Sequence, residues 1–108
     1  MSTDPRAEYD AVVTEMTASA PVISSKMFGM PCLKNDLGKA FAGFFRDAMV
    51  FKLDAPEHAA ALALSGAQIF DPSGGGHPMK AWVVVPVEHA ARWQEFAEAA
   101  HRALDKKR

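Results

Sequence analysis

The sequence predicts a single α+β domain in which an antiparallel sheet of about five strands is covered by helices. Three observations lead to this prediction. First, a stretch with the apolar spacing of an amphipathic helix lies at each end of the chain. Second, stretches of alternating apolar residues, bounded by turn residues, lie between these two helices. Third, one short alanine-rich stretch interrupts the predicted strands. The 108 residues can bury a core as one domain, residues 1–108, without a metal or a disulfide.

The first helix is predicted for residues 4–20. Asp4 is a suitable N-cap, and Pro5 fits the first helical position, where a missing N–H costs nothing. Apolar residues recur with helical spacing and form one stripe, consisting of Tyr9, Val12, Val13, Met16 and Ala20. Pro21 then ends the helix.

A meander of three strands is predicted next. The strands cover residues 22–28, 39–45 and 49–53, with an Asn-Asp-Leu-Gly turn at 35–38 and a two-residue hairpin loop at 46–47. Gly29 and Pro31 punctuate the end of the first strand. The third strand continues one apolar face with Met49, Phe51 and Leu53.

The middle strand of this meander has two apolar faces, so we expect it to be central in the sheet. Simple alternation places Phe41, Gly43 and Phe45 on one face and Ala40, Ala42 and Phe44 on the other. Gly43 in mid-strand indicates a bulge or the close approach of a covering helix.

The second half begins with a short helix, predicted for residues 58–65. Asp54 can cap it, Pro56 and Glu57 suit its first turn, and Gly66 suits its end.

Two strands, 67–70 and 80–85, follow this helix and are joined by an irregular loop at 71–78. The last helix is predicted to start at Glu88 or His89. Its apolar stripe consists of Trp93, Phe96, Ala97, Ala100 and Leu104.

The sequence contains no motif that predicts catalysis, a metal or a cofactor. Cys32 is the only cysteine, which excludes an intramolecular disulfide and a cysteine-based zinc cage, and we expect it to be a small buried apolar residue. The four histidines lack metal-ligand spacing, and Gly74–Gly76 leads into a strand instead of the Lys-Ser/Thr and helix of a phosphate-binding loop. We therefore do not expect an enzyme.

The expected compartment is the cytoplasm, by default. The N-terminus lacks the pattern of a signal peptide, and no apolar run is long enough to span a bilayer.

Candidate contact residues for a partner are Lys26 and Lys80 on strands and Gly75 and His77 in the glycine-rich loop. The net charge of −1 argues against a broad surface for nucleic acid. Interleaved aromatic and basic residues nevertheless leave a nucleic-acid-associated protein as an alternative, which would use the basic tail and the lysines Lys26, Lys39, Lys52 and Lys80.

Several segments together resemble the N-terminal domain of TfoX/Sxy-type proteins. They are KMFG at 26–29, LGKAFAGFF at 37–45, AMVFKLD at 48–54, AQIFD at 67–71 and HPMKAWVVVP at 77–86. The best markers are the Met-Phe-Gly start and the Pro-Met-x-x-Trp strand, about 50 residues apart, and the resemblance covers nearly the whole chain.

This resemblance implies a YjbR-like fold and a non-enzymatic binding or regulatory module. It further implies competence-type transcriptional regulation through a protein partner or a homo-oligomer, and it supplies no catalytic residues. The chain departs from the family in ending after the closing helix, without the helical C-terminal domain of the two-domain regulators. It also has Met30-Pro31-Cys32 where many members have a glycine- and tyrosine-containing turn. A small enzyme built around His77 or Cys32 is the remaining alternative.

Overall fold

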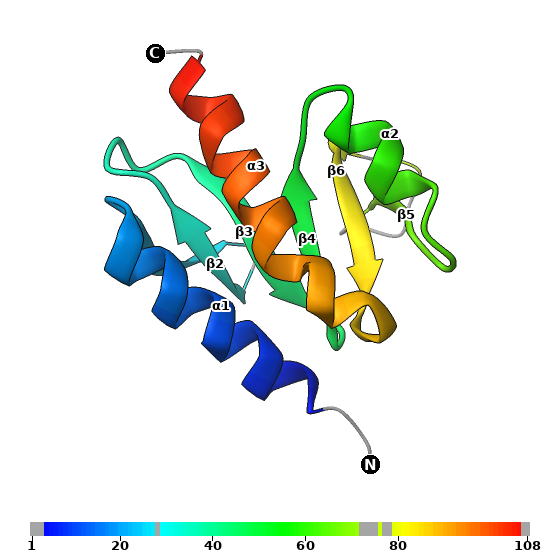
Figure 1. The fold of residues 1–108 in the computed structure, drawn as a ribbon, viewed down its shortest axis with the longest axis horizontal. Helices are drawn as coiled ribbons and strands as arrows, with labels where there is room; N and C mark the ends of the chain where they lie inside the picture. Colours follow the sequence, from blue (N-terminus) through cyan, green and yellow to red (C-terminus); the bar gives the residue numbers. More distant parts are fainter. Residues whose placement is uncertain (1–3, 28, 72–75, 77–78, 107–108) are drawn as a thin grey trace.

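The computed structural model describes residues 4–27, 29–71, 76 and 79–106, which form one sheet with helices on one of its faces (Figure 1). In chain order, the elements are α1 (Pro5–Ser19), β1 (Ile23–Met27), β2 (Met30–Lys34), β3 (Ala40–Phe45), β4 (Ala48–Lys52), α2 (Glu57–Leu62), β5 (Gln68–Phe70), β6 (Met79–Pro86), η1 (Val87–Arg92, a 3₁₀ helix) and α3 (Trp93–Lys106). The strands lie in the order β1-β2-β3-β4-β6-β5, and all neighbours are antiparallel. The predicted α+β class and the two terminal helices are confirmed.

The sheet has six strands instead of about five, because the first part of the meander is a hairpin. Gly29 takes a φ of +75°, which turns the chain directly from β1 into β2. Pro31 is tolerated within β2 because the pairing of β2 with β3 starts only at Cys32. An N–H at Pro31 would therefore have no partner in β3. The prediction treated Gly29 and Pro31 as the end of a strand, whereas they are a turn residue and an interior residue.

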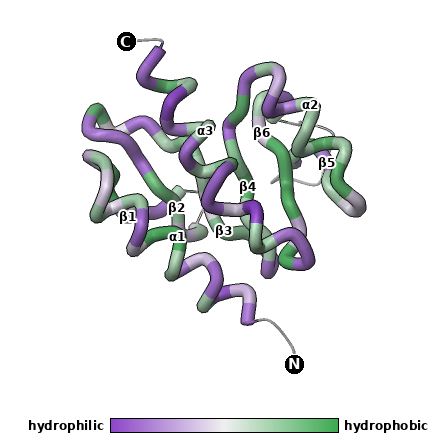
Figure 2. The backbone as a smooth tube through the Cα atoms, viewed as in Figure 1, coloured by the Kyte–Doolittle hydropathy of each residue, from purple (hydrophilic) through white to green (hydrophobic). Residues whose placement is uncertain are grey.

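The face of the sheet that carries α1 and α3 holds the main core (Figure 1). Both predicted apolar stripes pack there, with Val13 and Ala20 half-buried and the other members buried. Met49, Phe51 and Leu53, from β4 and the residue after it, are buried in the same core. Trp93 is fully buried, and its indole Nε1–H donates a hydrogen bond to the Val85 carbonyl at 3.1 Å. This bond ties the start of α3 to the end of β6, the strand that Figure 2 colours as hydrophobic along most of its length.

A one-residue irregularity in β3 changes the predicted faces of that strand. Leu33 pairs with Ala42, but the next residue of β2, Lys34, pairs with Ala40, so Phe41 is an extra residue. Phe41 therefore packs in the same core cluster as Ala42 and on the helix side of the sheet. Its ring lies edge-on to the His101 imidazole of α3, with 5.2 Å between centroids. The predicted grouping of Phe41 with Gly43 and Phe45 is wrong.

The opposite face of the sheet carries a second apolar cluster and is covered by the curl of the sheet itself. Met30, Val50, Phe70 and Trp82 are buried in this cluster. Phe45 of β3 and Phe70 of β5 meet with 5.0 Å between ring centroids, although β4 and β6 lie between their strands. In a flat sheet these strands would be about 14 Å apart. The sheet therefore curls toward this face, which we call the concave face.

Gly43 lies where a larger residue would crowd its neighbours on the concave face. A Cβ at this position would lie 2.7 Å from Met30 Cε and 3.2 Å from the Pro31 carbonyl oxygen. The close neighbour is thus a side chain from β2, and the strand irregularity falls at Leu33/Lys34 instead of at Gly43. The expectation of a covering helix or a bulge at Gly43 is wrong.

Two helix starts also differ from the prediction. α2 begins at Glu57 with Pro56 in the N-cap position and without a side-chain cap, and it ends at Leu62. The backbone carbonyl oxygen of Asp54 accepts a hydrogen bond from the His58 N–H at 2.9 Å. Asp54 therefore contacts the first turn of the helix through its backbone. The closing helix begins as the 3₁₀ helix η1 and becomes α-helical only at Trp93.

We expect Gly43→Ala to lower the free energy of unfolding by about 1 kcal/mol, because the added methyl group displaces the end of the Met30 side chain and crowds the Pro31 carbonyl oxygen. Met30→Ala removes the displaced group. In the double variant the two losses should therefore sum to clearly less than their separate values. Urea denaturation of the four proteins measures this coupling.

The matched control is Gly38→Ala, where φ is +79° and a new Cβ meets nothing within 4 Å. This substitution should cost stability through backbone strain alone and should add to Met30→Ala without coupling. Equal coupling for both glycines would refute the role given to Gly43.

Candidate functional site

The structure separates the two predicted contact residues that it describes. Lys26 lies on β1, at one edge of the sheet, and Lys80 lies on β6, four positions further along the strand order. Gly75 and His77 lie outside the described residues. Lys26 and Lys80 therefore do not share one site.

The lysines proposed for nucleic acid are divided between the two ends of the sheet. Lys52 at the end of β4 pairs with Trp82, two residues after Lys80. Lys39 precedes the start of β3, which is at the same end of the sheet. Lys26 pairs with Pro31 at the opposite end, close to the β1–β2 turn. A ligand that contacted all four would have to span the length of the strands.

Two described histidines bond to backbone groups, a third, His101, faces Asp105 with 4.0 Å between Nδ1 and Oδ2, and the cysteine is buried. His58 Nε2 donates to the Lys80 carbonyl at 2.9 Å, and His89 Nε2 donates to the Ser65 carbonyl at 2.8 Å. Cys32 is fully buried, as expected, and burial raises the pKa of its thiol. Among the residues that the structure describes, no three His, Cys, Asp or Glu side chains are grouped to hold a metal ion.

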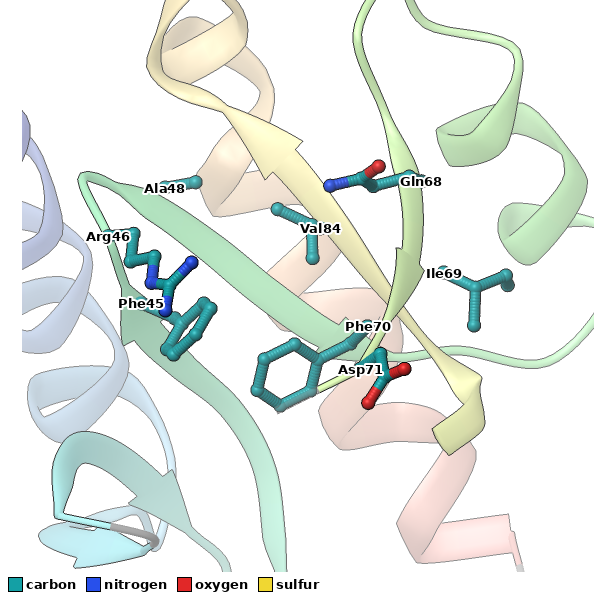
Figure 3. Close-up of a pocket in the computed structure, with 8 residues that line it drawn as sticks. All are labelled: Phe45, Arg46, Ala48, Gln68, Ile69, Phe70, Asp71 and Val84. Atoms are coloured by element: carbon teal, nitrogen blue, oxygen red, sulfur yellow. The ribbon is translucent and has the colours of Figure 1, made fainter. Parts of the chain in front are cut away.

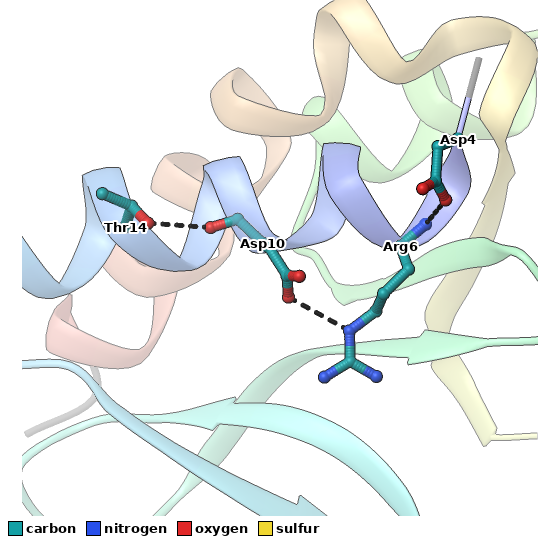
Figure 4. A network of polar contacts seen from close by, with 4 residues as sticks. All are labelled: Asp4, Arg6, Asp10 and Thr14. Carbon is teal, nitrogen blue, oxygen red and sulfur yellow. Dashed lines mark hydrogen bonds and ion pairs between the residues drawn. The ribbon is translucent and has the colours of Figure 1, made fainter.

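A polar network along the first half of α1 supports the helix start (Figure 4). Asp4 Oδ1 accepts the Arg6 N–H at 3.0 Å, which confirms the predicted N-cap, and Arg6 Nε donates to Asp10 Oδ1 at 3.0 Å. The Arg6 guanidinium also lies over the rings of Tyr9 and Phe44, 5.7 and 5.8 Å from their centroids. These contacts help to hold α1 on the sheet.

β1 is an edge strand whose outer side has no partner strand in the described part of the protein. It pairs with β2 over its five residues without a bulge. Ser24 and Lys26 are exposed, and Ile23 is 53% exposed although it is a large apolar residue. An edge of this kind presents free backbone hydrogen-bonding groups to a further strand.

The second candidate site is a pocket of about 280 Å³ at the mouth of the concave face (Figure 3). It lies between the β3–β4 hairpin and β5. Its lining residues are Phe45, Arg46, Ala48, Gln68, Ile69, Phe70, Asp71 and Val84. In Figure 3 the Arg46 guanidinium stands beside the Phe45 ring, with 5.0 Å from its central carbon to the ring centroid, and the Phe70 ring lies next to them.

Sequence reasoning missed this pocket because its aromatic residues are distant in the chain. Phe45 and Phe70 meet only through the curl of the sheet. The one local signal was the two-residue Arg46-Asp47 connection, which is the predicted hairpin loop and has a positive φ at both residues, 48° and 64°.

Comparison with protein-family models, with curated proteins and with solved structures found no match to this chain. None of the described helices is long and apolar enough to cross a membrane.

We expect Tyr9→Phe to leave the free energy of unfolding nearly unchanged at neutral pH or to raise it slightly. The Tyr9 hydroxyl is buried and has no hydrogen-bond partner among the described residues, so its removal breaks no bond. Burial also raises the pKa of Tyr9 above its ordinary value of 10.0. The unfolded chain therefore releases this proton first, and wild-type stability should fall as the pH rises above about 10.

Urea denaturation of both proteins between about pH 8 and about pH 11 measures the two effects. At alkaline pH the variant should lose less stability than the wild type, because it has no Tyr9 hydroxyl to ionise. The loss of stability caused by ionisation of Cys32 should be the same in both proteins. A loss of about 1–3 kcal/mol at neutral pH would instead reveal a hydrogen bond to this hydroxyl.

Proposed function

We propose that this chain is a non-enzymatic binding and regulatory domain that recognises an extended segment of a partner protein by strand addition to β1. The observation that carries the proposal is the open, regular and exposed edge of this strand. In strand addition, backbone hydrogen bonds supply affinity and alternate side chains supply specificity.

The backbone groups available at the edge follow from the pairing. The Pro31 carbonyl oxygen lies 3.2 Å from a Cβ built on Gly43, so it points toward β3. Backbone groups alternate in direction along a strand, and Lys26 is the residue opposite Pro31. The N–H and C=O groups of Lys26 and Ser24 therefore point away from β2, toward the open edge.

The side chains of β1 indicate the chemistry of the segment. Met27 packs with the cluster on the concave face, and the period of two places Ile23 on the same face. Lys26 and Ser24 face the side of the helices. A bound strand with apolar residues on the concave side and acidic residues opposite Lys26 would complement both faces.

Two further considerations support a binding role. His58 and His89 donate hydrogen bonds to backbone carbonyl oxygens, Cys32 is buried, and His101 faces Asp105 of its own helix with 4.0 Å between Nδ1 and Oδ2. The resemblance to the N-terminal domain of TfoX/Sxy-type proteins favours a regulatory partner, and competence-type transcriptional regulation is the corresponding role that we propose for this chain.

Ser24→Pro should abolish binding of the segment and leave the fold intact, because it removes an outward N–H that β2 does not use. A display library of extended peptides selected on the immobilised domain provides the measurement. We expect enrichment of peptides that alternate apolar and acidic residues, and loss of at least tenfold in their affinity on Ser24→Pro.

Ser24→Ala is the control, since it removes the hydroxyl and retains the N–H, and it should bind as the wild type does. Peptides that bind both variants equally would overturn strand addition at β1. Self-association of the wild type that Ser24→Pro removes would assign the edge to a second copy of the chain instead. Turnover of a substrate that depends on one exposed polar residue would refute the non-enzymatic role.

A further inference from the structure

The pocket at the mouth of the concave face has an apolar interior built from two aromatic rings. Phe70 is fully buried, and Phe45 meets it at 69° between ring planes with 5.0 Å between centroids. Ala48 and Val84 complete the apolar wall. An open pocket of about 280 Å³ is just below the usual range for small-molecule sites, which starts near 300 Å³, so it suits a ligand with a single ring.

One cation is held at the rim of this pocket. The Arg46 guanidinium lies 5.0 Å from the centroid of the Phe45 ring, an arrangement that orders a side chain with several rotatable bonds. Arg46 forms no ion pair or side-chain hydrogen bond with another residue in the described part of the chain. Its planar fork can therefore donate two parallel hydrogen bonds to a carboxylate.

A negative charge on the same wall limits what can enter. The Asp71 carboxylate also lines the pocket, where its Oδ2 accepts the Gly76 N–H at 3.2 Å. When one negative group of a ligand is bound to Arg46, the Asp71 carboxylate repels a second negative group on the same ligand. Gln68 adds a neutral amide that can donate to or accept from the ligand.

From these contacts we propose that the pocket binds a small aromatic monocarboxylate. The ring lies against Phe45 and Phe70, and the carboxylate accepts hydrogen bonds from Arg46. The pocket lies toward β5, the edge strand opposite β1. Ligand binding in the pocket therefore goes beyond strand addition at β1, and the result of one test does not decide the other.

Titration of the ¹⁵N-labelled domain with sodium benzoate tests the proposal. We expect saturable shifts of the amide signals of the β3–β4 hairpin and of β5, with a Kd on the order of a millimolar for a ligand of this size. Acetate lacks the ring, benzyl alcohol lacks the charge, and phthalate carries a second charge. Each should bind at least about fivefold more weakly than benzoate.

Arg46→Gln should weaken benzoate binding about tenfold, which is the usual contribution of a hydrogen bond to a charged group. Arg46→Lys keeps the charge without the fork and should retain part of the affinity. Arg92→Gln is the matched control, because Arg92 is a cation on the opposite, helix-bearing side that pairs with Glu95. It should bind benzoate as the wild type does.

Phe45→Leu tests the ring contact separately and should weaken benzoate more than acetate. The unchanged remainder of each amide spectrum establishes that the variants are folded. Three outcomes would overturn the proposal: shifts spread over the whole surface without saturation, equal binding of benzoate and benzyl alcohol, or equal affinity in wild type and Arg46→Gln.

Discussion

The structure depends on one constraint, which is that the sheet is apolar on both faces while its long helices cover only one. α1 and α3 bury the helix-side core. The other face has no such layer among the described elements, and Val50, Met30 and Trp82 are buried there where the sheet curls. Gly43 leaves room on this face for the end of the Met30 side chain.

The same curl determines where the two candidate sites lie. It brings β3 and β5 together and so creates the aromatic pocket at one margin of the sheet. At the other margin β1 has no partner strand on its outer side among the described residues, and three features protect this edge from indiscriminate pairing: its short length, two serines and Lys26. A single bent sheet thus offers a small-molecule pocket and a strand-binding edge that do not compete for the same residues.

Much of the fold could be predicted from the sequence because its signals are local. Asp4 and Pro5 define the start of α1, and the aromatic stripe of α3 has an unambiguous period. The split of the first strand and the reversed side of Phe41 could not be predicted, since both depend on how β2 pairs with β3. Of the candidate sites, the edge strand that carries Lys26 could be identified in part from the sequence pattern. The pocket was not, because curvature is a property of the whole sheet and has no local pattern.

The hairpin that carries Arg46 has a consequence for the stability of this surface. Both of its loop residues adopt positive φ, a geometry for which Asn-Gly is the favoured pair and in which an arginine costs roughly 1 kcal/mol. The contact of the Arg46 guanidinium with the Phe45 ring offsets part of this strain, so Arg46→Gly should relieve the backbone and lose the contact at the same time.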